Sequence, residues 1–316
     1  MSTPLAVIAI GGNSLIRDKE HQTVADQYDA VCETAGHIAD LVQAGYRVVV
    51  THGNGPQVGF ILRRAELAVK EIHMHPVPLV SCGADTQGAI GYQIQQALDN
   101  EYRRRGMNAQ SVTLVTQVRV DPDDPAFKNP AKPIGTFYSS EEVEAIKKEN
   151  PDWILIEDAG RGFRRVVPSP KPLEIIELPA IKALLDQNFH LVAVGGGGIP
   201  VIEKKGELIG VDAVIDKDYA TALLAGNLDA DLLIISTGVK EVCLNFGKPD
   251  QITLQKITLD EARGYRDAGH FAPGSMLPKV EAAIGFLEAG GKEVIITSPD
   301  HLKEAVTAGG GTHILP

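Results

Sequence analysis

The chain of 316 residues has only three cysteines, no long apolar run and no excess of basic residues. Cys32, Cys82 and Cys243 are far apart and odd in number, so we expect no disulfide framework and a reducing cytoplasm. No apolar stretch approaches the roughly 18 residues of a membrane span, and we see no signal peptide at the start. The formal net charge of −11 argues against a general nucleic-acid binder. The site for an anionic substrate must then be a local positive island.

Two common nucleotide-binding motifs are also missing. The P-loop pattern G-x-x-x-x-G-K-[ST] is absent, because Gly247-Lys248 and Gly291-Lys292 are followed by Pro and Glu. The dinucleotide fingerprint G-x-G-x-x-G is interrupted at Gly53-Asn-Gly55-Pro-Gln-Val58, where Val replaces the third Gly. The sequence therefore favours neither a P-loop NTPase nor a nicotinamide-binding protein.

What the chain does have is a regular alternation of short β-branched runs with helical patterns. Short strands alternating with helices of this length indicate a mostly parallel sheet covered on both faces. We therefore predict an α/β fold with a doubly wound, mostly parallel open sheet sandwiched by helices. The predicted strands are 5–10, 46–51, 112–115, 190–194, 232–236 and 293–297, and the predicted helices are 24–44, 56–70, 85–105, 180–187, 219–228 and 278–289. The basic run Arg103-Arg-Arg105 ends one of these helices, where it complements the helix dipole, and we expect it to be solvated.

One segment, 118–172, interrupts this rhythm because it is dense in proline and charged residues. Proline at both borders suggests rigid joints around a small excursion. Within it, 153–157 and 164–167 have the pattern of a hairpin. We predict a small protruding α+β lid subdomain; the alternative is a long surface loop.

Glycine-rich turns follow three of the predicted strands, at Gly11-Gly12-Asn13, Gly53-Asn54-Gly55 and Gly195–Gly198. In open α/β sheets, ligands bind at the carboxyl ends of strands. Glycine lets backbone N–H groups approach phosphate oxygens closely, and the following helix N-terminus adds a favourable dipole. One such turn could be purely structural, but three at one predicted edge favour a phosphate site.

The most informative run is Gly210-Val-Asp-Ala-Val-Ile-Asp-Lys-Asp218, followed later by Gly274-Ser-Met-Leu-Pro-Lys279. Two ammonium groups with a carboxylate between them suit a phosphoryl group in transfer, because they neutralise its oxygens while the carboxylate orients them. Lys217 could instead be a surface lysine at a helix start, but the helix dipole disfavours a cation there unless an anion binds. We interpret the chain as a phosphoryl-transfer enzyme.

Five motifs in order resemble those of the amino acid kinase family, and within it the carbamate kinases. The resemblance extends from about residue 7 to residue 316 and includes the segment 118–172. The motifs are Ile10-Gly-Gly-Asn13, Thr51-His-Gly-Asn-Gly-Pro-Gln-Val-Gly59, Gly195-Gly-Gly-Gly-Ile-Pro200, Gly210–Asp218 and Pro273-Gly-Ser-Met-Leu-Pro-Lys279. Two further runs, Asn129-Pro-Ala-Lys-Pro-Ile-Gly135 and Glu157-Asp-Ala-Gly-Arg-Gly162, match the protruding subdomain of carbamate kinases.

The resemblance implies a reversible reaction in which ADP and carbamoyl phosphate give ATP and carbamate with Mg²⁺, in arginine or carbamoyl phosphate catabolism. By motif position, Lys217 and Lys279 would hold the transferring phosphoryl group and Asp218 would organise the two lysines. Lys132 would reach from the lid onto carbamoyl phosphate. Donors around the phosphoryl group and carbamate would come from Gly11, Gly12, Asn13, Gly53, Asn54, Gly55, Gly196 and Gly197.

The resemblance also implies how the chain is divided. Residues 1–230 would form an N-terminal lobe with the carbamoyl phosphate site and a homodimer interface, and 231–316 a C-terminal lobe for the nucleotide. The nucleotide would contact Thr237, Val239, Val242, Ser275 and Met276. We expect no protein-bound metal cluster, no nucleic acid and no membrane. Two other hypotheses remain: a related kinase acting on another carboxylate or a nucleoside monophosphate, and a non-catalytic nucleotide sensor.

Overall fold

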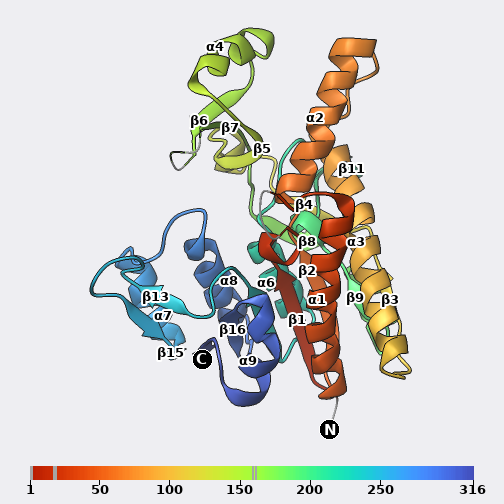
Figure 1. Cartoon of the computed structure of the whole chain (residues 1–316), viewed down its shortest axis with the longest axis vertical. Helices are drawn as coiled ribbons and strands as arrows, with labels where there is room; N and C mark the ends of the chain where they lie inside the picture. Colours follow the sequence, from red (N-terminus) through yellow and green to blue (C-terminus); the bar gives the residue numbers. More distant parts are fainter. Residues whose placement is uncertain (1–2, 17–19, 159, 161) are drawn as a thin grey trace.

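The computed structural model describes residues 3–16, 20–158, 160 and 162–316. Its largest sheet has eight strands in the order β15-β17-β16-β12-β1-β2-β9-β3 (Figure 1). All neighbouring strands in it are parallel except the antiparallel pair of β16 and β17, so the predicted mostly parallel open sheet is confirmed. The strands are β1 (Leu5–Ile10), β2 (Arg47–His52), β3 (Ser111–Thr113), β9 (His190–Val192), β12 (Leu232–Ser236), β15 (Lys256–Thr258), β16 (Val294–Thr297) and β17 (Thr312–Leu315).

Helices cover both faces of this sheet because its central strands are apolar on both sides. In β1, Ala6 and Ile8 belong to the core beneath α1, α3 and α9, whereas Leu5 and Val7 belong to the core beneath α5, α6, α7 and α8. Successive strand residues point to opposite faces, so one buried strand joins two cores. The helices are α1 (Val24–Gln43), α3 (Leu79–Arg104), α5 (Leu178–Asp186), α6 (Lys217–Asn227), α7 (Leu259–Asp267), α8 (Met276–Glu288) and α9 (Leu302–Ala308).

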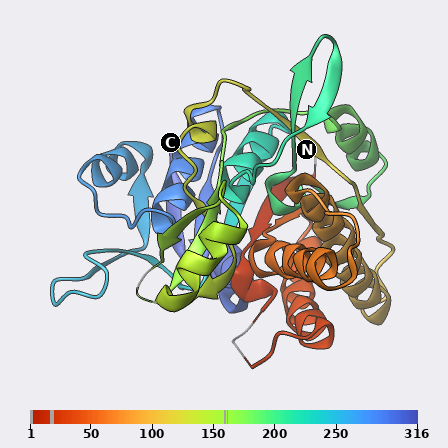
Figure 2. The same ribbon diagram turned by 90° about the horizontal axis from the view of Figure 1, so that it is seen from above.

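A second sheet of four strands, in the order β11-β10-β4-β8, lies beside the first. Its strands are β4 (Gln117–Val120), β8 (Pro172–Ile175), β10 (Ile199–Lys204) and β11 (Glu207–Gly210). The β10–β11 hairpin projects from the body of the molecule (Figure 2). Both ends of the segment 118–172 lie in this sheet, because β4 and β8 pair with each other. The sheet therefore forms the base on which the rest of that segment stands.

The protruding part of the segment is a three-stranded antiparallel sheet, in the order β5-β7-β6, with helix α4 (Figure 1, yellow-green). The strands are β5 (Lys132–Tyr138), β6 (Ile154–Glu157) and β7 (Phe163–Val167), and α4 spans Ser140–Glu149. The predicted hairpin is confirmed, because β6 and β7 pair antiparallel. Ser139 starts α4 through a capping box with Glu142. We call the part from Lys132 to Val167 the lid; helix α2 (Gly55–Ile72) extends beside it.

The C-terminal third contains elements that the sequence patterns did not predict. An antiparallel ribbon of β13 (Val242–Leu244) and β14 (Ile252–Leu254) precedes β15 and α7. All strands after residue 231 that join the large sheet lie on the β12 side of β1. In the described part of the chain, none of the helices combines the length and apolar character that crossing a membrane would require.

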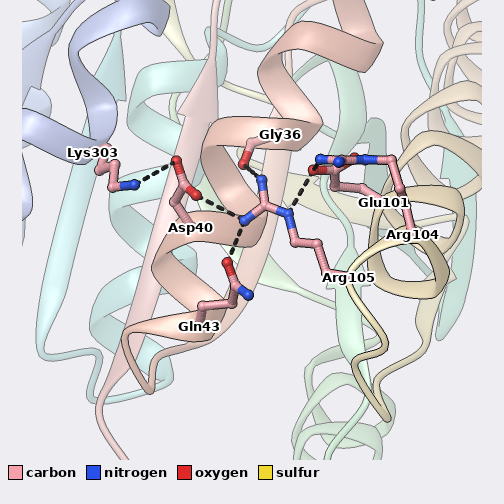
Figure 3. A network of polar contacts seen from close by, with 7 residues as sticks. All are labelled: Gly36, Asp40, Gln43, Glu101, Arg104, Arg105 and Lys303. Atoms are coloured by element: carbon pink, nitrogen blue, oxygen red, sulfur yellow. Dashed lines mark hydrogen bonds and ion pairs between the residues drawn. The ribbon is translucent and has the colours of Figure 1, made fainter.

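The basic run at the end of α3 differs from its prediction at Arg105, whose side chain is only 14% exposed. Its guanidinium donates to Asp40 at 2.7 Å, Glu101 at 2.6 Å and Gln43 at 2.6 Å, and to the Gly36 carbonyl at 2.8 Å (Figure 3). The expectation of a solvated cluster is therefore wrong for this residue. Because Gly36, Asp40 and Gln43 lie on α1 and Glu101 lies on α3, Arg105 joins α1 to α3.

Candidate active site

A cavity of about 210 Å³ lies where the carboxyl ends of β1 and β2 meet the start of α6, and residues of the lid close one side of it. It is the place where open α/β sheets bind ligands. The structure brings most of the predicted site residues together in its wall. Those residues are Gly12, Gly53, Asn54, Gly55, Lys132, Gly196, Lys217, Asp218, Ser275 and Lys279.

Lys217, Asp218 and Lys279 form a buried ion triad beside the cavity. Lys217 Nζ lies 2.5 Å from Asp218 Oδ1, and Lys279 Nζ lies 3.0 Å from Asp218 Oδ2. The side chains are 14%, 4% and 16% exposed, respectively. Lys217 and Asp218 begin α6, whereas Lys279 lies in the first turn of α8. The carboxylate between the lysines thus joins two helix N-termini at one point.

The electrostatics of the triad keep Asp218 ionised and favour the binding of an anion beside the lysines. Burial opposes the charge on Asp218, but Lys217 and Lys279 outweigh it and lower its pKa to about 2. Burial also lowers the pKa of Lys217; the Asp218 charge opposes this, and the Lys279 charge adds to it. A cation at the start of a helix is further disfavoured by the dipole. An incoming anion would relieve both effects.

The glycine turns make room for this arrangement. A Cβ on Gly196, whose φ is +66°, would lie 2.4 Å from Asn54 Nδ2, and a Cβ on Gly197, whose φ is +91°, would lie 2.3 Å from the Ile215 carbonyl oxygen. Both positions therefore require glycine for conformation and for space. Gly196 lines the cavity, while Gly197 packs behind it against the segment before α6.

The remaining turn residues also divide into those that line the cavity and those that pack against neighbouring backbone. Gly53 lines the cavity, and a Cβ on it would lie 3.5 Å from the Lys217 side chain. Asn54 donates to the Thr86 hydroxyl at 3.2 Å, which fixes its amide. Gly11 packs against β12, because a Cβ there would lie 2.9 Å from the Ser236 carbonyl oxygen. Asn13 is in the turn, but its side chain lies outside the described part of the structure.

Sequence reasoning missed Asp216, which lines the same cavity. Its Oδ1 accepts from the Asp218 N–H at 2.9 Å, and this caps α6. Its Oδ2 accepts from Lys132 Nζ at 2.5 Å. The signal was in the sequence, because an Asp just before a helix start is a typical N-cap. We predicted that helix to begin at residue 219, two residues late.

The residues predicted for the nucleotide are more dispersed. Ser275 precedes α8 and lines the cavity. The Thr237 N–H donates to the Thr297 carbonyl at 2.8 Å, and the buried Val242 donates its N–H to the Thr312 hydroxyl at 2.8 Å. Met276 packs against the core beneath α8. Thr237, Val239, Val242 and Met276 lie outside this cavity's wall, so their nucleotide contacts stay a prediction.

Within the described residues, no group of three or more His, Cys, Asp and Glu side chains could hold a metal ion. Both oxygens of Asp218 are engaged by lysines, and both oxygens of Asp216, the other carboxylate in the wall, are engaged by the Asp218 N–H and by Lys132. Mg²⁺ commonly binds through one or two carboxylates, substrate phosphates and water. The donor set therefore fits a magnesium ion carried by phosphate oxygens.

Two lysines held by one carboxylate at the ligand-binding edge of this fold are the arrangement that the sequence predicts for a phosphoryl-transfer site, and comparison with known proteins shows the family. The sequence model of the amino acid kinase family matches residues 4–298. A carbamate kinase-like protein of Escherichia coli, YahI, is 53% identical over 98% of both chains, and a carbamate kinase of Thermococcus kodakarensis is 48% identical over 98% of both. A carbamate kinase from Giardia lamblia, whose structure was solved bound to AMP-PNP, has 46% sequence identity to this chain. Its structure matches with a TM-score of 0.92 over 99% of both chains.

The chain therefore belongs to the amino acid kinase family, among its carbamate kinases and carbamate kinase-like proteins.

Proposed function

We propose that the protein is a carbamate kinase that catalyses the reversible transfer of a phosphoryl group between carbamoyl phosphate and ADP. The observation that carries the proposal is the buried triad of Lys217, Asp218 and Lys279 at a cavity that the lid lysine Lys132 also lines. The family membership and the carbamate kinases among its relatives support it. A role in arginine or carbamoyl phosphate catabolism is part of the proposal.

The reaction needs positioning and charge neutralisation more than it needs covalent catalysis. A β-phosphate oxygen of ADP attacks the phosphorus of carbamoyl phosphate, the bond from phosphorus to the carbamoyl oxygen breaks, and carbamate leaves as an anion. No proton has to move. The ammonium groups of Lys217 and Lys279 stabilise the charge on the equatorial oxygens, and Asp218 keeps the two lysines apart.

The lid supplies the third cation. Lys132 is one-third exposed at the cavity wall, where it would contact carbamoyl phosphate. Gly12, Gly53 and Asn54 would donate to the phosphoryl and carbamate oxygens. His52 is buried behind them, and burial lowers its pKa to about 4, so it is neutral at physiological pH and adds no cation. The binding charge therefore resides in the lysines.

Magnesium and the nucleotide complete the site in this proposal. Mg²⁺ would be held by phosphate oxygens and would neutralise charge on the transferring group. The N-terminal lobe, residues 1–230, would bind carbamoyl phosphate, and the C-terminal lobe, residues 231–316, would bind the nucleotide. Ser275, which precedes α8, is the predicted nucleotide residue that lines the cavity together with the triad.

A homodimer formed through the N-terminal lobe is also part of the proposal. The large sheet ends at β3 on that side, which leaves an edge strand. Near this edge, Tyr92 on α3 is 59% exposed and Val115 is 58% exposed. Large exposed apolar side chains beside a sheet edge favour an interface. The molar mass in solution, measured by light scattering, tests this part separately.

The experiment that tests the function is ATP formation from ADP, Mg²⁺ and fresh carbamoyl phosphate. Acetyl phosphate and acyl-amino-acid phosphates serve as parallel donors. We expect fast turnover with carbamoyl phosphate and little with the amino-acid donors. Turnover with another donor alone would show a related kinase, and nucleotide binding without any turnover would show a sensor.

A further inference from the structure

Asp216 links the lid to the transfer site through a single side chain. Its two carboxylate oxygens serve different parts of the molecule: Oδ1 caps α6, and Oδ2 holds Lys132 of β5 at 2.5 Å. The Asp216 side chain is 14% exposed and that of Lys132 is 33% exposed. Capping would require only one oxygen, and an uncharged one would suffice. The second contact therefore needs an explanation of its own.

The backbone beside Lys132 is held by another contact. Gly59 of α2 packs directly on Gly135 of β5, since a Cβ on Gly59 would lie 2.5 Å from the Gly135 Cα. Gly135 has a φ of +73°, which suits glycine. This contact anchors β5 three residues after Lys132, so the first residues of the strand and the lysine side chain depend on other contacts. A lysine has a long flexible stem and a point charge, so a nearby carboxylate determines where its ammonium lies.

The charge balance of the cavity wall makes the Asp216 carboxylate unfavourable for anion binding unless it also positions Lys132. Lys132, Lys217 and Lys279 contribute three positive charges to the wall, and Asp216 and Asp218 remove two of them. Asp218 is occupied by Lys217 and Lys279. A second carboxylate at a site for phosphate weakens anion binding by like-charge repulsion, a cost that capping by an uncharged side chain would avoid and that better placement of a cation would offset.

We propose that Asp216 is a positioning residue that holds Lys132 over the cavity before substrate binds and then shares it with carbamoyl phosphate. The inference rests on the proposed function for its substrate. In the free protein, the ion pair keeps the lid lysine within reach of the phosphoryl site. When the anion enters, Lys132 has its ammonium already in place, so less side-chain entropy is lost on binding.

The test separates capping from positioning by comparing two variants at residue 216. Asp216→Ser keeps a good helix cap but is too short and uncharged to hold Lys132. Asp216→Asn keeps the cap and the length and removes only the charge. We expect both to raise KM for carbamoyl phosphate about 5-fold to 10-fold, which corresponds to the loss of one charged contact. KM for ADP should change less than 2-fold, and the melting temperature should stay within a few degrees.

A double-mutant cycle shows whether the effect passes through the lysine. Lys132→Ala should raise KM for carbamoyl phosphate about 10-fold or more. If Asp216 acts through Lys132, Lys132→Ala with Asp216→Ser should match Lys132→Ala within about 2-fold. The proposal would be overturned if the effects of the two substitutions on KM multiplied in the double variant. It would also be overturned if the Asp216 variants had an unchanged KM for carbamoyl phosphate.

Hydrogen exchange in the free protein gives a readout that does not require turnover. In Asp216→Ser we expect faster amide exchange in β5 than in the wild type, with unchanged exchange in α6 because its cap persists. A wild type inactive with carbamoyl phosphate would refute the proposed function, but faster β5 exchange would still support the link to the lid. Unchanged exchange in β5 would contradict that link. Gly88→Ala, in open space on α3, is the control for substitution alone.

Discussion

The molecule contains two buried charge clusters that differ in how many of their hydrogen-bond donors are used. The Arg105 cluster between α1 and α3 (Figure 3) and the triad of Lys217, Asp218 and Lys279 have similarly low side-chain exposure. The Arg105 guanidinium donates to Asp40, Glu101, Gln43 and Gly36, which uses nearly all of its donors. In the described part of the chain, each triad lysine has Asp218 as its hydrogen-bond partner, although an ammonium carries three donors.

This difference separates a structural cluster from the cluster that we propose to be functional. The Arg105 cluster satisfies its charges internally and has no need of a ligand. The triad has more positive charge than negative and borders a cavity, so its unsatisfied donors are available to an anion. Burial alone, or a shifted pKa alone, does not distinguish the two, because Glu101 and Asp218 both have a pKa lowered to about 2.

The largest expected effect comes from Asp218→Asn. The change leaves Lys217 and Lys279 without their counter-charge and removes what orients them. We expect turnover with carbamoyl phosphate to fall on the order of 10²–10³-fold and the unfolding free energy to fall by about 3 kcal/mol. Steady-state kinetics and urea denaturation measure the two losses. A variant with normal turnover would show that the lysines need no organiser.

Next comes Arg105→Ala, which breaks the structural cluster and leaves the site intact. Removing one partner of a buried pair leaves the carboxylates of Asp40 and Glu101 uncompensated, so we expect the unfolding free energy to fall by about 2–3 kcal/mol. kcat and KM should change less than about 2-fold, because the cluster does not touch the cavity. Arg104→Ala is the matched control, since that side chain is 69% exposed. A large loss of turnover in Arg105→Ala would contradict the division between the clusters.

An effect that is smaller for each residue should appear with pH, and it should come from neither cluster. Asp218 and Glu101 have pKa values lowered from 3.8 and 4.5 to about 2, so their contributions to stability are complete above these ordinary values and are lost only as pH falls from there to about 2. Burial lowers the pKa of His52 and His190 from 6.5 to about 4. The unfolded state binds more protons than the folded state between these values, so stability falls as pH drops through that window.

We expect each histidine to cost about 2 kcal/mol of unfolding free energy between about pH 7.5 and pH 5. Denaturant titrations at several pH values measure the slope. His190→Asn should flatten it, since His190 contacts Tyr102 inside the N-terminal lobe and lies away from the triad. Stability that is constant down to pH 5 would show that these rings are not neutral in the fold.

Much of the fold was predictable because its signals are local. The strand patterns of β1 and β12 and the helix patterns of α1 and α8 depend on short stretches of sequence, and they were confirmed to within a few residues. The pairing of β4 with β8 and β10 was not predictable, because it joins segments up to about 80 residues apart whose apolar patterns do not specify a partner. The ribbon of β13 and β14 was missed because its strands are short.

Prediction of the site was limited in the same way, because contacts between distant segments leave no local signal. Lys217, Asp218 and Lys279 were predicted to share one site because their motif and chemistry agree; the structure brings them together, and their catalytic roles stay a prediction. Asp216 was missed because its role depends on Lys132, 84 residues away. Gly197 and Gly11 were assigned to substrate, yet both pack against backbone, and no sequence pattern tells a glycine for a ligand from one for a close contact.

The most direct test of the account is the initial rate of ATP formation from carbamoyl phosphate, ADP and Mg²⁺, measured for the wild type, Lys217→Ala and Lys279→Ala. We predict rapid turnover in the wild type and a loss on the order of 10²–10³-fold in each variant. Lys279 still pairs with Asp218 in Lys217→Ala, so this variant should stay folded and its main loss should be in turnover. A wild type that binds nucleotide without turnover, or a lysine variant with near-normal rate, would contradict the assignment of this triad as the transfer site.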